Sequence, residues 1–240
     1  MVIQTFRQRC QELGALTALA EALDALMRRI RRDWGCPRYY LLAQPVHAGP
    51  LMPGGRRGRL VIRRLTPGDT ALEQIPRTRG QIADRFGRGG ICLAAFPPDR
   101  EEPLGFIWLL FGPWREPEHR CILHPPDSPP CALDIDVYVH SEARGSLVFA
   151  QLWQAANELL LSSGIQWSLS RISAFNHRSL RAHERLGAER VGTLQFLQLG
   201  GLEIVLATCP PYVSWSRTSS EPPSITVRPP DRRDLQGHHA

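Results

Sequence analysis

Acidic and hydroxyl side chains recur at every second position in the segment DIDVYVH, which runs from Asp134 to His140. In an extended strand this alternation places Asp134, Asp136, Tyr138 and His140 on one face and the apolar residues on the other. Two carboxylates at this spacing in a central strand would repel each other, which suits a general base working near neutral pH. Hydrogen bonds or salt bridges with arginines on neighbouring elements explain the pair equally well.

A turn and a helix start directly after this strand. The turn contains Arg144, Gly145 and Ser146, which offer a guanidinium, a freely turning backbone and a hydroxyl. A helix N-terminus adds backbone N–H groups and the positive end of the helix dipole, and together these attract phosphate. Leu147 and Phe149 stand where a phosphate-binding turn usually has small residues, so they either weaken binding or serve the helix core.

The elements that must position these residues follow from hydrophobic spacing and from turn residues. We expect strands at 59–65, 91–96, 103–112, 133–140 and 165–173, helices at 69–86, 146–162 and 176–187, and a final hairpin at 191–208. The insert 113–131 is expected to be a loop. This order predicts an α/β (α+β) fold, a mixed and mostly antiparallel twisted sheet with helices on both faces.

A helix is also expected near the N-terminus, followed by a strand at 38–46 and a Gly/Pro-rich linker at 47–58. Its apolar side chains follow steps of three and four residues and form one stripe, namely Leu13, Leu16, Ala20, Leu23, Met27 and Ile30. Docking of this stripe onto the rest of the chain is the favoured interpretation, and a homodimer is the alternative. The predicted division is an extension at 1–58, a core domain at 59–213 and a disordered tail at 214–240.

Two segments of the predicted core resemble a known family. NHRSLRAHERLGAERVG, at 176–192, resembles the Asn-x-x-Ser…His…Leu-Gly signature that closes the GNAT N-acetyltransferase core. IRRLTPGD, at 62–69, is similar to the first strand and helix entry of that superfamily. The resemblance covers residues 60–208 and leaves 1–58 and the tail outside. It implies the GNAT fold, with a degenerate pyrophosphate turn at 144–149.

The resemblance also implies a site for acyl-CoA, most simply acetyl-CoA, beside the strand 133–140. Backbone N–H groups near Val137 and Val139 would then meet the thioester oxygen, and the pyrophosphate would rest on the turn 144–146. Asn176 and Ser179 would contact the cofactor arm, although helix capping alone explains Asn176. His183 stands where the family often has a tyrosine that donates a proton to the leaving thiolate, and packing within the helix is the alternative.

The function expected from this resemblance is transfer of an acetyl or other acyl group from acyl-CoA to an amine of a small molecule or other acceptor, by direct attack. Asp134, Asp136, Tyr138 and His183 are the candidate catalytic residues. Two alternatives stay open, because the turn lacks its usual small residues. One is a different donor, an acyl carrier protein or an aminoacyl-tRNA, and the other is a non-catalytic binding or scaffolding module.

Composition excludes some other classes of protein. Six cysteines occur without a CxxC pair or a histidine at ligand spacing, so we expect no metal. The net charge of +6 is dispersed, so no specific nucleic-acid binding is expected. Apolar runs fall short of the ~20 residues that span a bilayer, and we expect a cytoplasmic protein without a membrane span.

Overall fold

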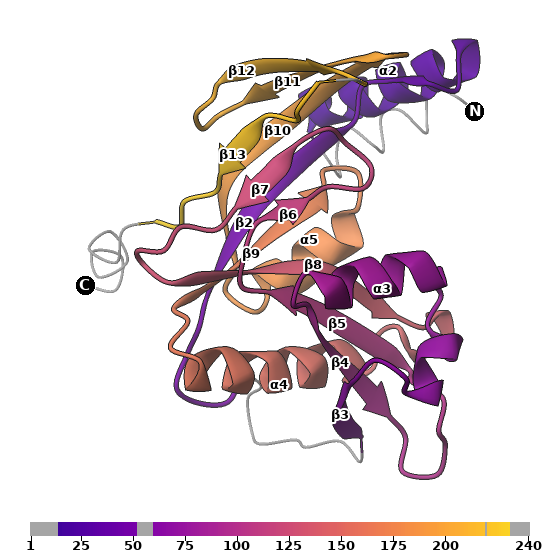
Figure 1. Cartoon of the computed structure of the whole chain (residues 1–240), viewed down its shortest axis with the longest axis vertical. Coiled ribbons are helices and arrows are strands. Elements are labelled where there is room, and N and C mark those ends of the chain that lie inside the picture. The colour runs from indigo at the N-terminus through magenta and orange to yellow at the C-terminus, as the bar shows by residue number, and fades with distance from the viewer. Residues whose placement is uncertain (1–13, 52–59, 219, 231–240) are drawn as a thin grey trace. The chain divides into compact units, whose positions relative to one another are not determined.

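The structure is a computed structural model that describes residues 14–51, 60–218 and 220–230 (Figure 1). The chain folds into two compact units. The first unit combines Met1–Gln44, Pro113–Pro126 and Leu169–Ala240, and the second combines Pro45–Gly112 with Asp127–Ser168.

The first unit contains five neighbouring strands in the order β12-β11-β10-β2-β9. Their bounds are β2 Arg38–Pro45, β9 Trp167–Ser173, β10 Glu189–Leu199, β11 Leu202–Ala207 and β12 Val213–Arg217. A two-residue strand, β1 (Trp34–Gly35), pairs with β10, and a small separate sheet has the order β13-β7-β6, formed by β13 Ser224–Thr226, β7 Ile122–His124 and β6 Trp114–Arg115. The helices of this unit are α2 (Ala15–Ile30) and α5 (His177–Glu184).

Strand β2 corrects the predicted division of the chain at residue 59. It lies between β9 and β10, so part of the expected extension is an inner strand of the sheet. Its consecutive residues Leu41, Leu42 and Ala43 are all buried. A strand that is covered on both faces has this pattern, and a strand on a peripheral extension does not need it.

Two further segments differ from expectation. The predicted tail contains most of β12, which pairs with β11, and also β13, so its described part is not disordered. The insert 113–131, expected to be a loop, contains β6 and β7. In both segments the paired strands are short and carry few apolar residues, so hydrophobic alternation is too weak to reveal them.

The second unit contains strands in the order β8-β5-β4-β3. Their bounds are β3 Val61–Leu65, β4 Ile91–Phe96, β5 Gly105–Leu110 and β8 Cys131–Val139. The helix expected at 69–86 is divided into a 3-10 turn, η2 (Thr70–Gln74), and α3 (Arg79–Gly87). Pro76 lies between them, and the Thr78–Gln81 capping box starts α3.

Helices cover both faces of these four strands. Phe106 and Trp108 of β5 pack with Ile82 and Phe86 on the α3 side. Gly105 of β5 points to the other side, where a Cβ would meet Val148 and Leu152 of α4 (Val148–Ser162). Successive residues of a strand face opposite ways, so α3 and α4 lie on opposite faces.

The predicted order of elements between residues 60 and 208 is confirmed, apart from the added β6 and β7 and the divided helix. The hairpin between β10 and β11 turns at Gly200–Gly201 as expected, with Leu199 opposite Leu202. The fold class is therefore mixed α/β with a mostly antiparallel sheet. In the described part of the chain no helix is long and apolar enough to span a membrane.

Candidate functional site

The two aspartates of β8 do not share a face. The register between β5 and β8 shifts at one point, so that Trp108 pairs with Asp136 and Leu109 pairs with Asp134, leaving Ile135 as the extra residue. Trp108 and Leu109 are adjacent and point to opposite faces of β5, and their partners do the same. The expectation of a carboxylate pair on one face is wrong because this β-bulge interrupts the alternation.

Asp136 is the centre of an ion cluster on the α3 face. Arg77 binds it with two hydrogen bonds, Nε to Oδ2 and Nη2 to Oδ1, both 2.7 Å long. Arg85 of α3 donates a third from Nη1 to Oδ2 at 2.6 Å. The side chains of Asp136 and Arg85 are only 11% and 7% exposed. Three hydrogen bonds from two guanidiniums thus hold the carboxylate in place.

Tyr138 lies on the same face of β8, two residues after Asp136. Its ring stacks on Phe106 at 5.4 Å between centroids, and the Arg77 guanidinium lies 5.6 Å from its centre. Arg77 and Arg85 were not anticipated from the sequence. They lie 59 and 51 residues away from Asp136, and only the fold of α3 onto the sheet brings them there.

The turn after β8 contains Arg144, Gly145 and Ser146, the residues expected to contact pyrophosphate. Gly145 adopts φ 84°, a left-handed conformation that favours glycine, and the position of a Cβ on it is open space. Arg144 is exposed, and its Nε lies 3.4 Å from the carbonyl oxygen of Val139. The Ser146 hydroxyl donates to the Ala143 carbonyl at 2.6 Å and accepts from the N–H of Val148, the first residue of α4, at 3.3 Å.

The residues after the turn divide between surface and core. Leu147 is 42% exposed, whereas Val148 is buried. Phe149 is half-buried, with its ring 6.3 Å from that of Trp153. A core role therefore fits Phe149 in part and does not fit Leu147, whose side chain remains at the surface beside the turn.

Val137 and Val139 lie in β8 beyond the bulge. Val137 pairs with Ile107, and Val139 pairs with Gly105. Both are half-buried, and the backbone of β8 ends its pairing where the His140 N–H donates to the Leu104 carbonyl.

Asn176, Ser179 and His183 belong to the other unit of the chain, at α5. The Asn176 side chain accepts from the Ser179 N–H at 3.2 Å and caps the helix. The ring of His183 is 2% exposed, and its Nδ1 lies 2.8 Å from the Ser179 carbonyl oxygen, to which it donates. Burial lowers the pKa of His183 to about 4, so the ring is neutral at pH 7. A neutral, enclosed imidazole is a weak candidate for the acid that protonates a thiolate.

The first unit also contains a buried polar chain that no sequence motif indicated. His119 lies with Nδ1 3.2 Å from Glu203 Oε2 and with Nε2 2.9 Å from the Tyr39 hydroxyl. Glu203 further accepts from the Gln198 amide at 2.8 Å and from the Arg120 N–H. Burial works against the Glu203 charge, but the hydrogen bonds from His119, Gln198 and Arg120 outweigh it and lower the pKa of Glu203.

Arg171 extends this chain on β9. Its Cζ lies 4.0 Å from the centre of the Tyr39 ring, and its Nη2 donates to Glu116 at 2.6 Å. Burial raises the pKa of Tyr39, so its phenol stays protonated at neutral pH. These hydrogen bonds and ring contacts link β2, β9 and β11, which is the arrangement of a structural network.

Cysteine and metal chemistry find no support among residues 14–51, 60–218 and 220–230. The cysteines there are free thiols, and burial raises the pKa of Cys92 and of Cys131 to about 12, far from that of a nucleophile. No group of three His, Cys, Asp or Glu side chains in these ranges could hold a metal ion.

Comparison with known proteins gave structural matches alone. No family model matches the chain, and no curated protein does. The aminoglycoside N-acetyltransferase AAC(6')-Iy, solved with CoA, is 22% identical with a TM-score of 0.42, covering 54% of this chain and 92% of that one. A tandem GNAT protein from the clavulanic acid biosynthesis pathway is 17% identical with a TM-score of 0.44, covering 64% of this chain and 50% of that one.

A GCN5-related N-acetyltransferase from Sphaerobacter thermophilus is 13% identical with a TM-score of 0.45. That match covers 82% of this chain and 57% of the other. The structural matches are thus with GNAT acetyltransferases, and they extend over about half to most of this chain at low identity.

Proposed function

We propose that this chain is an N-acyltransferase that moves an acyl group, most simply acetyl, from acyl-CoA to an amine. The observation that carries the proposal is the junction between β8 and α4. There a glycine in the left-handed conformation, an exposed arginine and the N-terminus of a 15-residue helix come together within a few residues. The GNAT-like signatures at 62–69 and 176–192 point to the same activity.

The junction suits the pyrophosphate of CoA for physical reasons. The N–H groups in the first turn of a helix have no acceptor within the helix, and the dipole adds about 0.3–1 kcal/mol for a nearby anion. Gly145 lets the backbone approach the ligand closely, and the Arg144 guanidinium can bind phosphate oxygens with two parallel hydrogen bonds. Leu147 is the feature that opposes binding, because its exposed side chain stands where small residues are usual.

In the proposed reaction the amine nitrogen attacks the thioester carbonyl, forming a C–N bond and breaking the C–S bond. The nitrogen loses a proton, and the thiolate gains one. Backbone N–H groups near Val137 and Val139 are proposed to stabilise the oxyanion. Asp136 is held by two arginines and His183 is buried and neutral, which leaves Asp134 and Tyr138 as candidates for proton transfer. These two lie on opposite faces of β8, so only one of them can serve this site.

One observation favours a second candidate function, a GNAT-like module that binds a ligand without turnover. Two of the four predicted catalytic side chains, Asp136 and His183, are committed to structural contacts. Such structural contacts are expected in a protein that keeps the fold but has lost catalytic activity. The two functions differ in turnover, not in the binding of CoA.

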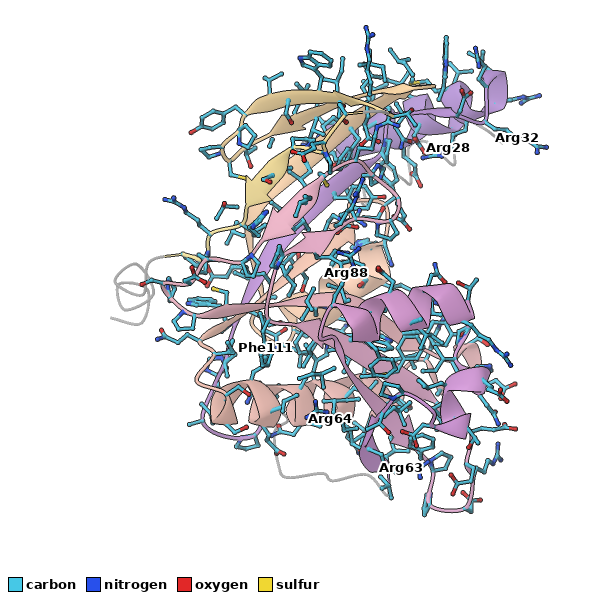
Figure 2. All side chains as sticks on the ribbon, in the orientation of Figure 1. Arg28, Arg32, Arg63, Arg64, Arg88 and Phe111 are labelled. Atoms are coloured by element: carbon cyan, nitrogen blue, oxygen red, sulfur yellow. The ribbon has the colours of Figure 1, made fainter. Side chains whose placement is uncertain are left out.

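Calorimetric titration of the protein with acetyl-CoA tests the proposal, and Arg144→Glu is the informative variant. Wild-type protein is expected to bind saturably, and the charge reversal to weaken binding by roughly tenfold or more. Arg64→Glu is the matched control, since Arg64 (Figure 2) is exposed on the edge strand β3, which is separated from β8 by β4 and β5. It is expected to leave the affinity within about twofold.

Absence of saturable binding by the wild-type protein at millimolar acetyl-CoA would refute the proposal. If binding is present, release of free CoA thiol with a panel of primary amines separates the two functions. Turnover supports the transferase, whereas binding without turnover for every amine supports the second candidate.

A further inference from the structure

Helix α2 carries an exposed apolar stripe on its outer side. Its large apolar side chains are 43–74% exposed, and they are Leu16, Leu19, Leu23, Leu26 and Ile30. The expectation that the N-terminal stripe docks onto the rest of the chain is therefore wrong for Leu16, Leu23 and Ile30. Leu13, predicted as the first member, lies outside the described residues.

The side of α2 that does dock is a different one. Thr17 and Ala18 are the buried residues of the helix, and the Thr17 hydroxyl lies 2.9 Å from the Tyr40 hydroxyl on β2. About two turns further on, Asp24 accepts hydrogen bonds from the Cys36 N–H at 2.7 Å and from the Arg28 Nε at 2.9 Å. The helix is thus anchored by polar contacts, and its leucines face away from this anchor.

The spacing of the exposed leucines is that of a coiled-coil seam. From Leu16 to Ile30 the steps are three, four, three and four residues, so these side chains occupy the a and d positions of two heptads. Such a seam packs well against a second seam, because each a or d side chain inserts between four residues of the facing helix. The flanking positions hold Ala15, Ala20 and Ala22, whose small side chains permit close approach.

The exposed area matches the largest apolar patch of a typical monomer, which is often an interaction site. At these exposed fractions the five side chains present roughly 500 Å² per chain, where the largest patch on a monomer is about 300–600 Å² and is often functional. A two-fold pair would bury about 1,000 Å² from them alone, near the lower bound of a specific interface. Met27 and the flanking alanines add to this area.

We propose that the partner of this stripe is a second copy of the chain, and that two α2 helices pack as an antiparallel pair. The direction follows from charge. Arg28, Arg29, Arg31 and Arg32 cluster at the C-terminal end of α2, where Figure 2 labels Arg28 and Arg32. Parallel packing would bring two such clusters together, whereas antiparallel packing separates them by about 24 Å, more than two Debye lengths.

The antiparallel pair has a definite register. In it Leu16 faces Leu26 of the second copy, Leu19 faces Leu23 of the second copy, and the two Ala22 residues meet beside the two-fold axis. A parallel pair would instead set Ala22 opposite Met27. The alanine contact therefore distinguishes the two directions.

Sedimentation equilibrium of the full chain tests the pairing. Wild-type protein is expected to be dimeric at micromolar concentration, and Leu19→Glu to weaken association by roughly a hundredfold, because a carboxylate would be buried in the seam. Leu161→Glu is the matched control, because Leu161 is an exposed leucine on α4, away from the stripe. This variant is expected to leave association unchanged. Leu16→Glu repeats the test, and circular dichroism confirms that each variant is folded.

Three results would overturn the proposal. The first is a wild-type chain that stays monomeric at about 100 μM. If such a chain dimerises only after residues 1–13 are deleted, that segment and not a second copy covers the stripe. The second is a dimer that Leu19→Glu does not weaken. The third is a dimer lost on Trp215→Ser instead, which would assign the interface to the exposed Trp215 on β12.

Charge pairs at Ala22 test the direction. Ala22→Glu and Ala22→Lys are each expected to weaken their own dimers, since like charges meet at the axis, and an equimolar mixture is expected to form a heterodimer at least tenfold tighter than either. Equal affinity of the mixture and of the single variants would refute the antiparallel arrangement.

Discussion

Asp136→Asn tests whether the charge at the centre of the second unit holds the fold or performs chemistry. The substitution keeps the size of the side chain and removes its charge. Arg85 would then retain a positive charge at 7% exposure with no carboxylate beside it, and its guanidinium lies over the Trp108 ring at 5.4 Å. Arg77 is 24% exposed and can turn to water, so its share of the loss is small.

The size of the effect follows from this burial. Removing one partner of a buried ion pair costs about 3–5 kcal/mol, a large part of the roughly 5–15 kcal/mol that stabilises a domain. With a urea slope near 2 kcal/mol/M, the midpoint of unfolding is expected to fall by about 2 M. Replacing the pair by apolar residues, Asp136→Leu with Arg85→Met, should recover most of this loss.

Urea unfolding followed by tryptophan fluorescence measures the shift, because Trp108 lies directly beneath Arg85. The control is Asp84→Asn on the same helix, whose ion pair with Arg88 is exposed on both sides. This change is expected to cost less than about 0.5 kcal/mol. If Asp136→Asn unfolds at the same urea concentration as the control while amine acetylation is lost, the structural assignment is refuted and Asp136 is the base.

Two other buried ionisable groups, His183 and Glu203, give predictions in pH and temperature. The folded pKa of His183, about 4, lies below its unfolded value near 6.5, so stability is complete above pH 6.5 and declines by about 3 kcal/mol as the pH falls toward 4. In His183→Asn the urea midpoint should depend less on pH over this window. An unchanged pH dependence would contradict the burial of the His183 ring. Glu203→Gln leaves His119 and the Arg120 N–H without their anion, with an expected loss of about 3 kcal/mol and a melting temperature lower by roughly 6–12 °C at pH 7. Since the pKa of Glu203 is lowered in the folded state, the difference in melting temperature between wild type and Glu203→Gln should narrow in acid, where the wild-type carboxylate is protonated. Equal melting temperatures at pH 7 would argue against the network.

Much of the fold was predictable because it depends on local patterns. The strand at 91–96 and the cap at Asn176 were placed by neighbouring residues alone, and the structure confirms both. The hairpin at Gly200–Gly201 likewise needs only its turn and the apolar residues on either side. Gly145 was expected from its residue type to give the turn a freely turning backbone, and it adopts the left-handed conformation.

The site was less predictable, because a single residue changes its geometry. The bulge at Ile135 turns Asp134 away from Asp136, and alternation in the sequence gives no sign of it. The sequence did not reveal the position of β2 for a similar reason, since its neighbours in the sheet, β9 and β10, come more than 120 residues later in the chain. Pairing of this kind depends on the partner strand, and no property of β2 alone specifies it.

The amino-acid sequence by itself determined the order of the main strands and helices between residues 60 and 208, the Asn176 cap and the composition of the β8–α4 junction, because each depends on residues within a few positions of one another. Only the tertiary structure decided what the polar side chains do. Asp136 meets arginines 51 and 59 residues away, and His119 meets Tyr39 and Glu203 across 80 and 84 residues. Such partners are selected by packing and desolvation over the whole sheet, which is why aspartate and histidine patterns that suggested catalysis became ion pairs and a buried neutral ring.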